Sequence, residues 1–171
     1  MTERQETFMG GNPITLLGPK LETGEKAPEF TVLDIDLLPK HLDDYTGKIK
    51  IISVIPSIDT GVCSVQTTKF NEFAAGFDDD VVVLTISMDL PFAQKRWCGA
   101  EGTDRVEVLS DHREASFGEA YGVLIKELRL LNRAVFIIDK TDTVRYIEIV
   151  TENHEHPDYE RVLEALKDIK E

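Results

Sequence analysis

Two nearly continuous apolar runs constrain the fold of this chain more than any other feature. Lys48 to Pro56 reads KIKIISVIP, and Val81 to Met88 reads VVVLTISM. Runs this rich in isoleucine and valine are typical of buried strands. Between them, Val62 to Phe77 carries apolar residues at helical spacing. A strand, a helix and a second strand in this order indicate an α/β fold.

The rest of the chain continues this alternation of strands and helices. At the N-terminus, TFMGGNPITLLG contains a Gly-Gly-Asn-Pro turn signal and predicts a β-hairpin within residues 1–18. Further strands are predicted at Phe30–Leu33, Val106–Leu109, Ala134–Asp139 and Thr143–Val150, the last two forming a hairpin. Further helices are predicted at Pro91–Cys98, ended by Gly99, at Ser116–Tyr121, ended by Gly122, and at Asp158–Lys170. We therefore predict one domain over residues 1–171, with a mixed sheet flanked by helices.

Composition excludes several classes of function. The 171 residues carry a net charge of −13, which disfavours nonspecific binding to nucleic acid or to an anionic membrane. The sequence contains no apolar run near the ~20 residues that span a bilayer, and no export signal is visible. Two cysteines are too few for a secreted disulfide scaffold, so we expect a cytoplasmic protein whose cysteines are catalytic or metal-binding.

Cys63 occupies a position that favours reactivity, because it falls in the first turn of the helix predicted at Val62–Phe77. Free backbone N–H groups and the helix dipole favour a thiolate there. Thr60 offers a hydroxyl nearby, and Pro56 fixes the chain as it leaves the strand. Two plainer interpretations stay open at this point. Cys63 can be an inert buried side chain, and Asp59 or Thr60 can simply cap the helix.

The string PSIDTGVC, Pro56 to Cys63, resembles the peroxidatic motif P-x-x-x-T-x-x-C of peroxiredoxins. More fully, it resembles the atypical two-cysteine peroxiredoxins of the thiol peroxidase (Tpx) family. DLPFAQKRWCGAEG, Asp89 to Gly102, resembles the resolving-cysteine segment of that family, and the N-terminal hairpin matches as well. Shorter matches at Ala120–Gly122, Arg133–Val135 and Pro157–Tyr159 extend the resemblance over essentially the whole chain.

This resemblance implies a role for each matched residue. Cys63 would be the peroxidatic cysteine, which attacks a peroxide and becomes a sulfenic acid. Thr60 would hydrogen-bond the thiolate and the peroxide, and Pro56 would shield the sulfur from bulk water. Arg133 would stabilise the thiolate and the charge on the leaving oxygen. From sequence alone, Arg133 would otherwise be interpreted as a solvated charge at the mouth of a buried strand.

The resemblance also implies a catalytic cycle. Cys98 would attack the sulfenic acid and close an intramolecular disulfide with Cys63, which requires local loosening of both helices. Implied with it are a thioredoxin-like fold with an N-terminal hairpin extension and thioredoxin as reductant. The implied substrates are hydrogen peroxide and organic hydroperoxides, and the implied assembly is a homodimer without metal, haem or flavin. Lys95 and Arg96 either bias Cys98 toward thiolate or form a solvated helix face. Trp97 either lines the pocket or contacts a dimer partner, or else belongs to the core.

Three rival functions remain at the level of sequence. A metal site at His154-Glu155-His156 is poorly supported, because neither cysteine has a CxxC motif or a nearby histidine. We interpret NHEH, residues 153–156, as a solvated loop, and Asp78-Asp79-Asp80 as a solvated turn. A redox sensor or holdase would use the same two cysteines. A thiol–disulfide oxidoreductase is disfavoured by the absence of CxxC.

Overall fold

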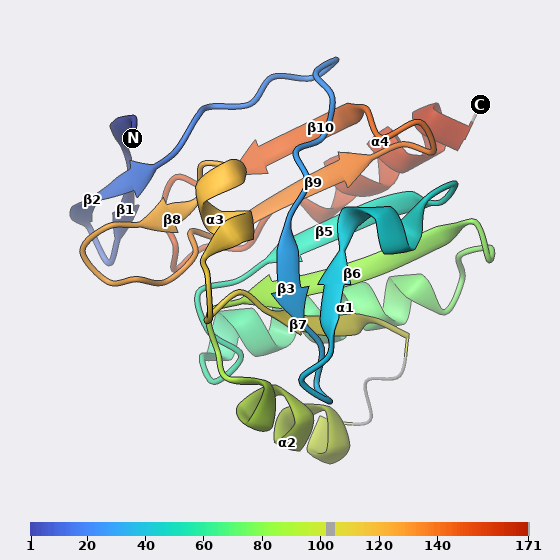
Figure 1. Cartoon of the computed structure of the whole chain (residues 1–171), viewed down its shortest axis with the longest axis horizontal. Helices are drawn as coiled ribbons and strands as arrows, with labels where there is room; N and C mark the ends of the chain where they lie inside the picture. The colour runs from blue at the N-terminus through green and yellow to red at the C-terminus, as the bar shows by residue number, and fades with distance from the viewer. Residues whose placement is uncertain (102–104, 171) are drawn as a thin grey trace.

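A computed structural model describes residues 1–101 and 105–170 of the chain. A seven-stranded sheet with the strand order β10-β9-β5-β6-β7-β3-β4 forms its centre (Figure 1). The strands of this sheet are β3 (Thr31–Leu33), β4 (Pro39–His41), β5 (Ile49–Val54), β6 (Val81–Ser87), β7 (Glu107–Ser110), β9 (Ala134–Ile138) and β10 (Val144–Ile149). The helices are α1 (Gly61–Ala74), α2 (Pro91–Glu101), α3 (Ser116–Ala120) and α4 (Tyr159–Lys170), with a 3-10 turn at Leu42–Tyr45. The predicted mixed sheet flanked by helices is confirmed.

The central position of β5 in the sheet explains why its sequence is a nearly continuous apolar run. β5 pairs with β6 in parallel and with β9 in antiparallel orientation, and all of its residues are buried. Alternate residues serve opposite faces: Ile49 and Ile51 pack in the cluster with α1 and α4, whereas Ile52 and Val54 pack in the cluster with α3. A strand covered on both sides shows no polar alternation.

A second sheet is built on the N-terminal hairpin. It consists of β1 (Glu3–Met9), β2 (Asn12–Leu17) and β8 (Leu124–Ile125), with β2 in the middle. The hairpin was predicted, but the two-residue β8 is too short to give a sequence pattern. Glu152, which follows β10, accepts hydrogen bonds from the backbone N–H groups of Gly10 and Gly11 at 2.8 and 2.9 Å. The turn of the hairpin is thereby attached to the loop after β10.

Other departures from the sequence predictions concern short elements and two helix ends. Helix α1 ends at Ala74, before the predicted end at Phe77. Strand β4 and the turn at Leu42–Tyr45 were not predicted. Gly99 does not end α2, which continues to Glu101, so the prediction for this boundary was wrong. Glycine is a poor helix former but costs only about 1 kcal/mol in a helix, which packing easily exceeds. Gly102, the last residue of the segment that resembles a resolving-cysteine motif, lies outside the described residues.

No helix within residues 1–101 and 105–170 is long and apolar enough to cross a membrane.

Candidate active site

Cys63 lies where β5 leads into α1, as the sequence predicted. Thr60 precedes the helix in an extended conformation, and its side chain makes no capping hydrogen bond. Its hydroxyl instead donates a long 3.4 Å hydrogen bond to the carbonyl of Ser57. Cys63 is the third residue of α1 and is fully buried. The sulfur is therefore held in the first helical turn, where the free N–H groups of the backbone favour negative charge.

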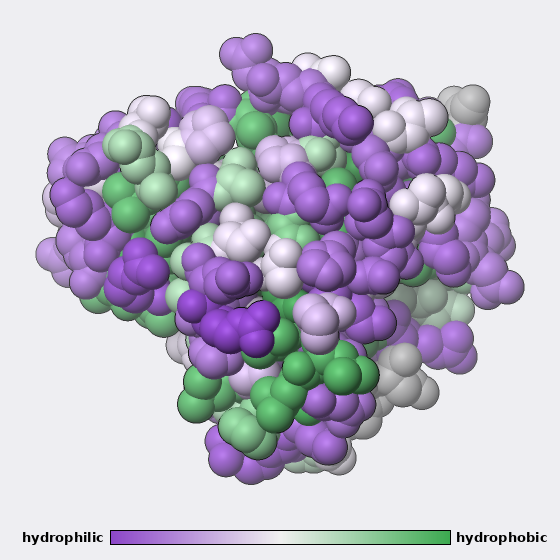
Figure 2. Space-filling model, in the orientation of Figure 1, coloured by the Kyte–Doolittle hydropathy of each residue, from purple (hydrophilic) through white to green (hydrophobic). Residues whose placement is uncertain are grey.

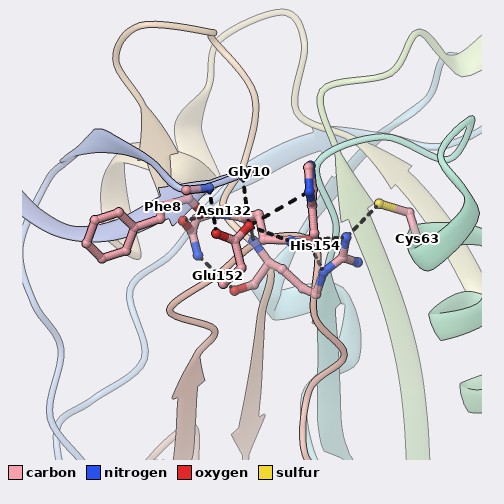
Figure 3. Close-up of polar contacts among 9 residues, drawn as sticks. Phe8, Gly10, Cys63, Asn132, Glu152 and His154 are labelled. Carbon is pink, nitrogen blue, oxygen red and sulfur yellow. Dashed lines mark hydrogen bonds and ion pairs between the residues drawn. The ribbon is translucent and has the colours of Figure 1, made fainter.

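Arg133 approaches this sulfur from the opposite side of the site. It immediately precedes β9, and its Nη2 donates to Sγ of Cys63 at 3.3 Å. A dashed line in Figure 3 marks this contact, with the sulfur pointing from α1 toward the strand ends. Arg133 is only 2% exposed, so the interpretation as a solvated charge is excluded. A buried guanidinium on sulfur favours the thiolate electrostatically.

The orientation of Arg133 is fixed by two further neighbours. Its Nη1 donates to Oε1 of Gln66 at 2.8 Å, and Gln66 in turn donates to Ser53 on β5. Its Nε and Nη2 both donate to the backbone carbonyl of Asn153, at 3.0 and 2.8 Å. The planar fork of donors is thus nearly saturated, which leaves little rotational freedom. Gln66 was not predicted as a site residue, although it lies one helical turn after Cys63.

Asn153 is a second residue beside Arg133 that sequence reasoning missed. It was assigned to a solvated NHEH loop, but it is fully buried, so that assignment was wrong for this residue. Its Oδ1 accepts the backbone N–H of Arg133 at 2.7 Å, and its Nδ2 donates to the carbonyl of Phe8 and to Oδ1 of Asn132. Figure 3 shows Asn132 and Phe8 on the far side of this network from Cys63. No pattern in the sequence marks Asn153 as buried. It lies in a polar segment without apolar periodicity, and such segments are usually solvated.

A cavity of about 280 Å³ opens beside these residues. Its wall is formed by parts of the chain that are distant in sequence: Met9, Pro56, Thr60, Gly61, Val62, Arg133, Asn153 and His154. Pro56 and Thr60, two of the predicted site residues, are therefore brought together with Arg133. Pro56 is buried and adds apolar surface without a donor, whereas Thr60 and Arg133 add hydrogen-bond donors. A small polar molecule with an apolar substituent fits such a lining.

Cys98 lies on α2, away from this cavity. It is half-buried and packs against the apolar cluster between the sheet and α1, while its neighbour Trp97 packs against the cluster of Ile55, Ile58 and Cys63. Cys63 is a reduced thiol, so the structure shows the chain before any disulfide between its two cysteines. Trp97 thus contacts the surroundings of one cysteine and directly precedes the other.

The charged neighbours of Cys98 face solvent. Lys95 and Arg96 are exposed, and Lys95 forms an ion pair with Asp36 at 3.2 Å. This supports the interpretation of Lys95 as part of a solvated helix face. In the part of the chain that the structure describes, no group of three or more His, Cys, Asp or Glu side chains is placed to hold a metal ion.

Two titratable groups, one of them close enough to feel the charge of Arg133, have pKa values raised by burial. Asp111, which follows β7, is 1% exposed, and burial raises the pKa of its carboxyl to about 6 although it accepts backbone N–H groups of Gly118 and Phe117. Burial likewise raises the pKa of Tyr159 to about 12, against the opposing effect of the Arg133 charge. At pH 7, Tyr159 is therefore neutral, whereas Asp111 is mostly ionised and gains its proton near pH 6.

The chain is similar to known proteins over most of its length. Residues 22–163 match the family model described as Redoxin. The chain is 61% identical over 155 residues to the thiol peroxidase of Oceanobacillus iheyensis, which covers 91% of this chain and 94% of that relative. It is 60% identical over 161 residues to the thiol peroxidase of Bacillus subtilis, with 94% and 95% covered. The crystal structure of a peroxiredoxin-like protein from Aquifex aeolicus matches with a TM-score of 0.90 and 41% identity, over 99% of each chain.

Proposed function

Since the chain belongs to the Redoxin family and is a thiol-dependent peroxidase of the peroxiredoxin type, we propose that it reduces hydrogen peroxide and organic hydroperoxides through Cys63 and Cys98. The reductant in this proposal is thioredoxin, and the compartment is the cytoplasm. The observation that supports it most is the 3.3 Å hydrogen bond from Arg133 to the sulfur of Cys63. A buried thiol with a guanidinium donor is set up to react as a thiolate.

In the first step, the Cys63 thiolate attacks the terminal oxygen of the hydroperoxide. The O–O bond breaks, an S–O bond forms, and the sulfur loses two electrons to the peroxide. The departing oxygen leaves as hydroxide or alkoxide and takes up a proton, which gives water or an alcohol. Arg133 and the Thr60 hydroxyl donate hydrogen bonds to the oxygens as negative charge moves onto them, and Pro56 keeps bulk water from the sulfur.

In the second step, the sulfur of Cys98 attacks the sulfenic acid of Cys63. An S–S bond forms, the S–O bond breaks, and water leaves with the proton of the thiol. Thioredoxin then supplies two electrons and two protons from its dithiol, and both cysteines return to the reduced state. The cycle needs no metal or organic cofactor.

We also propose that the protein works as a homodimer. Figure 2 shows hydrophobic residues gathered over α2 and the turn between β3 and β4. The exposed large hydrophobic side chains of these two segments are Leu37, Leu38, Leu90 and Phe92, and an exposed ion pair joins Asp36 to Lys95. Exposed apolar groups of this kind are typical of protein contacts. Sedimentation equilibrium tests this: the parent should be dimeric, and Phe92→Glu should shift it toward monomer, whereas a monomeric parent refutes the dimer.

A peroxide titration of the fully reduced protein tests the proposed chemistry. We expect one equivalent of cumene hydroperoxide to remove both thiols, counted under denaturing conditions, while a non-reducing gel shows monomer-sized bands. Loss of Cys63 alone, or disulfide-linked dimers, would contradict the role of Cys98. Consumption of many equivalents in the presence of thioredoxin separates an enzyme from a redox sensor, which is oxidised only once.

A further inference from the structure

A carboxylate that belongs to neither cysteine joins the two segments that carry them. Asp89 follows β6 and precedes α2, and its Oδ1 accepts the hydroxyl of Ser57 at 2.8 Å. Its Oδ2 accepts the backbone N–H of Ile58 at 2.7 Å and the hydroxyl of Ser87 at 2.6 Å. We refer to these three hydrogen bonds as the Asp89 bridge. They attach the loop that leads to Cys63 to the start of the helix that carries Cys98.

The bridge is itself anchored in the sheet and in α2. The hydroxyl of Ser110, at the end of β7, donates to the backbone carbonyl of Asp89. Gln94 on α2 is fully buried, and its Nε2 donates to Oγ of Ser87 at 3.1 Å and to the carbonyl of Leu109 at 2.9 Å. The Ser87 hydroxyl therefore takes part in two contacts. It donates to Asp89 and accepts a hydrogen bond from Gln94 in the first turn of α2.

A second, apolar contact joins the same two segments as the Asp89 bridge. Trp97, on the next turn of α2, packs against Ile55, Ile58 and Cys63. Ile58 therefore takes part in both contacts: its N–H binds Asp89, and its side chain belongs to the cluster against which Trp97 packs. If the loop at Ile58 moves, both of these contacts are lost, and the start of α2 is then held by the bonds of Gln94 and Ser110.

We propose that Asp89 is a positioning residue that makes the Cys63 loop and the Cys98 helix loosen together. This inference rests on the proposed function, in which Cys98 resolves the sulfenic acid of Cys63. While the bridge is intact, Cys63 stays beside Arg133, and Cys98 stays against the apolar cluster between the sheet and α1. Its rupture is the event that lets the two sulfurs meet, so the strength of the bridge sets how long the sulfenic acid survives.

Asp89→Asn tests the proposal, because an amide nitrogen cannot accept the N–H and O–H groups that the second carboxylate oxygen accepts. The sole tryptophan, Trp97, reports both steps in stopped-flow fluorescence with cumene hydroperoxide. Oxidation of Cys63 gives a phase proportional to peroxide concentration, and disulfide closure gives a phase independent of it. We expect closure on the order of tenfold faster in Asp89→Asn, since hydrogen bonds to a charged group are worth at least that factor.

Ser57→Ala is the milder variant and keeps the proposal testable if Asp89→Asn does not fold. It removes one hydrogen bond of the bridge, so closure should accelerate by about threefold. The matched control is Asp111→Asn, whose carboxylate is also buried but accepts the backbone N–H groups of Phe117 and Gly118 on α3. Equal acceleration in this control would mean that general destabilisation, and not the bridge, controls closure.

A second readout does not depend on chemistry at sulfur. Hydrogen exchange of the reduced protein should speed up in Asp89→Asn both at residues 57–60 and at residues 90–97, to a similar extent. Faster exchange in one segment alone, or closure within twofold of the parent, would overturn the proposal. Failure of the proposed function looks different: the parent itself would lack the peroxide-independent phase, or Cys98→Ser would retain it.

Discussion

At the scale of single residues, we expect the proposed reactivity of Cys63 to depend on how Arg133 is held. Lysine at position 133 would keep the charge but could not bind the Asn153 carbonyl, Gln66 and the sulfur at once. We expect Arg133→Lys to lower the second-order rate of Cys63 oxidation by about 100-fold, as for loss of one donor to a developing anion. Arg145→Lys, at an exposed ion pair with Asp139, is the control. An unchanged rate in Arg133→Lys would mean that charge alone suffices.

Asn153 holds Arg133 in place through hydrogen bonds with its backbone N–H and its guanidinium group. Asn153→Ala would leave the backbone N–H of Arg133 without its side-chain acceptor in the buried interior. We expect a loss of about 2–3 kcal/mol in the free energy of unfolding, the cost of stranding buried polar groups. Urea unfolding measures it, and the rate of Cys63 oxidation should fall in parallel. A variant that loses stability and keeps its full rate would separate Asn153 from the site.

Asp111 makes stability depend on pH. Its folded pKa, about 6, lies above the ordinary value of 3.8 for aspartate, so its favourable contribution is complete below the lower value and is lost as pH rises through about 6. The unfolding free energy of the parent minus that of Asp111→Asn should be about 2 kcal/mol larger at pH 4.5 than at pH 7. Urea titrations at the two pH values measure the difference. A constant difference would show that Asp111 is ionised throughout.

At the scale of elements, the backbone at Gly18, where the hairpin ends, packs closely against the backbone of α3. A Cβ on Gly18 would meet the carbonyl of Glu119 on α3 at 2.1 Å, and Gly18 has a φ of +106°. Gly18→Ala should therefore cost about 3 kcal/mol of unfolding free energy through clash and backbone strain. Gly24→Ala is the matched control, with a φ of +96° but open space around its Cβ. It should cost only about 1 kcal/mol, from the backbone conformation alone.

The elements also show which parts of the structure were predictable. Strands β5 and β6 and helix α4 followed from periodicity, because their burial is regular along the chain. The position of Cys63 followed from the strand-to-helix junction, and Arg133 followed from family resemblance alone. Asn153 did not, because its burial depends on Phe8 and Asn132, which contact it only through the tertiary fold. Gly99 misled the prediction for the same reason: local propensity is weaker than packing.

At the scale of the whole molecule, the net charge of −13 should affect which substrates reach Cys63. An anionic hydroperoxide, such as that of a fatty acid, is repelled at low ionic strength, whereas neutral cumene hydroperoxide is not. We expect the rate with the anion to rise severalfold between about 10 and 200 mM salt, as screening shortens the reach of the charge. The rate with cumene hydroperoxide should stay level. A falling rate with the anion would indicate that Arg133 attracts it more than the surface repels it.

The long sequence separation between the sulfur and its donor has a consequence for synthesis of the protein. Arg133 follows Cys63 by 70 positions, and Asn153, which orients Arg133, follows by 20 more. A growing chain on the ribosome therefore carries Cys63 well before the guanidinium that binds its sulfur exists. In the proposed mechanism, we therefore expect the nascent thiol to react with peroxide no faster than an ordinary cysteine. Fast peroxide chemistry is expected only after the last quarter of the chain has been translated and Asn153 has packed against Phe8 of β1.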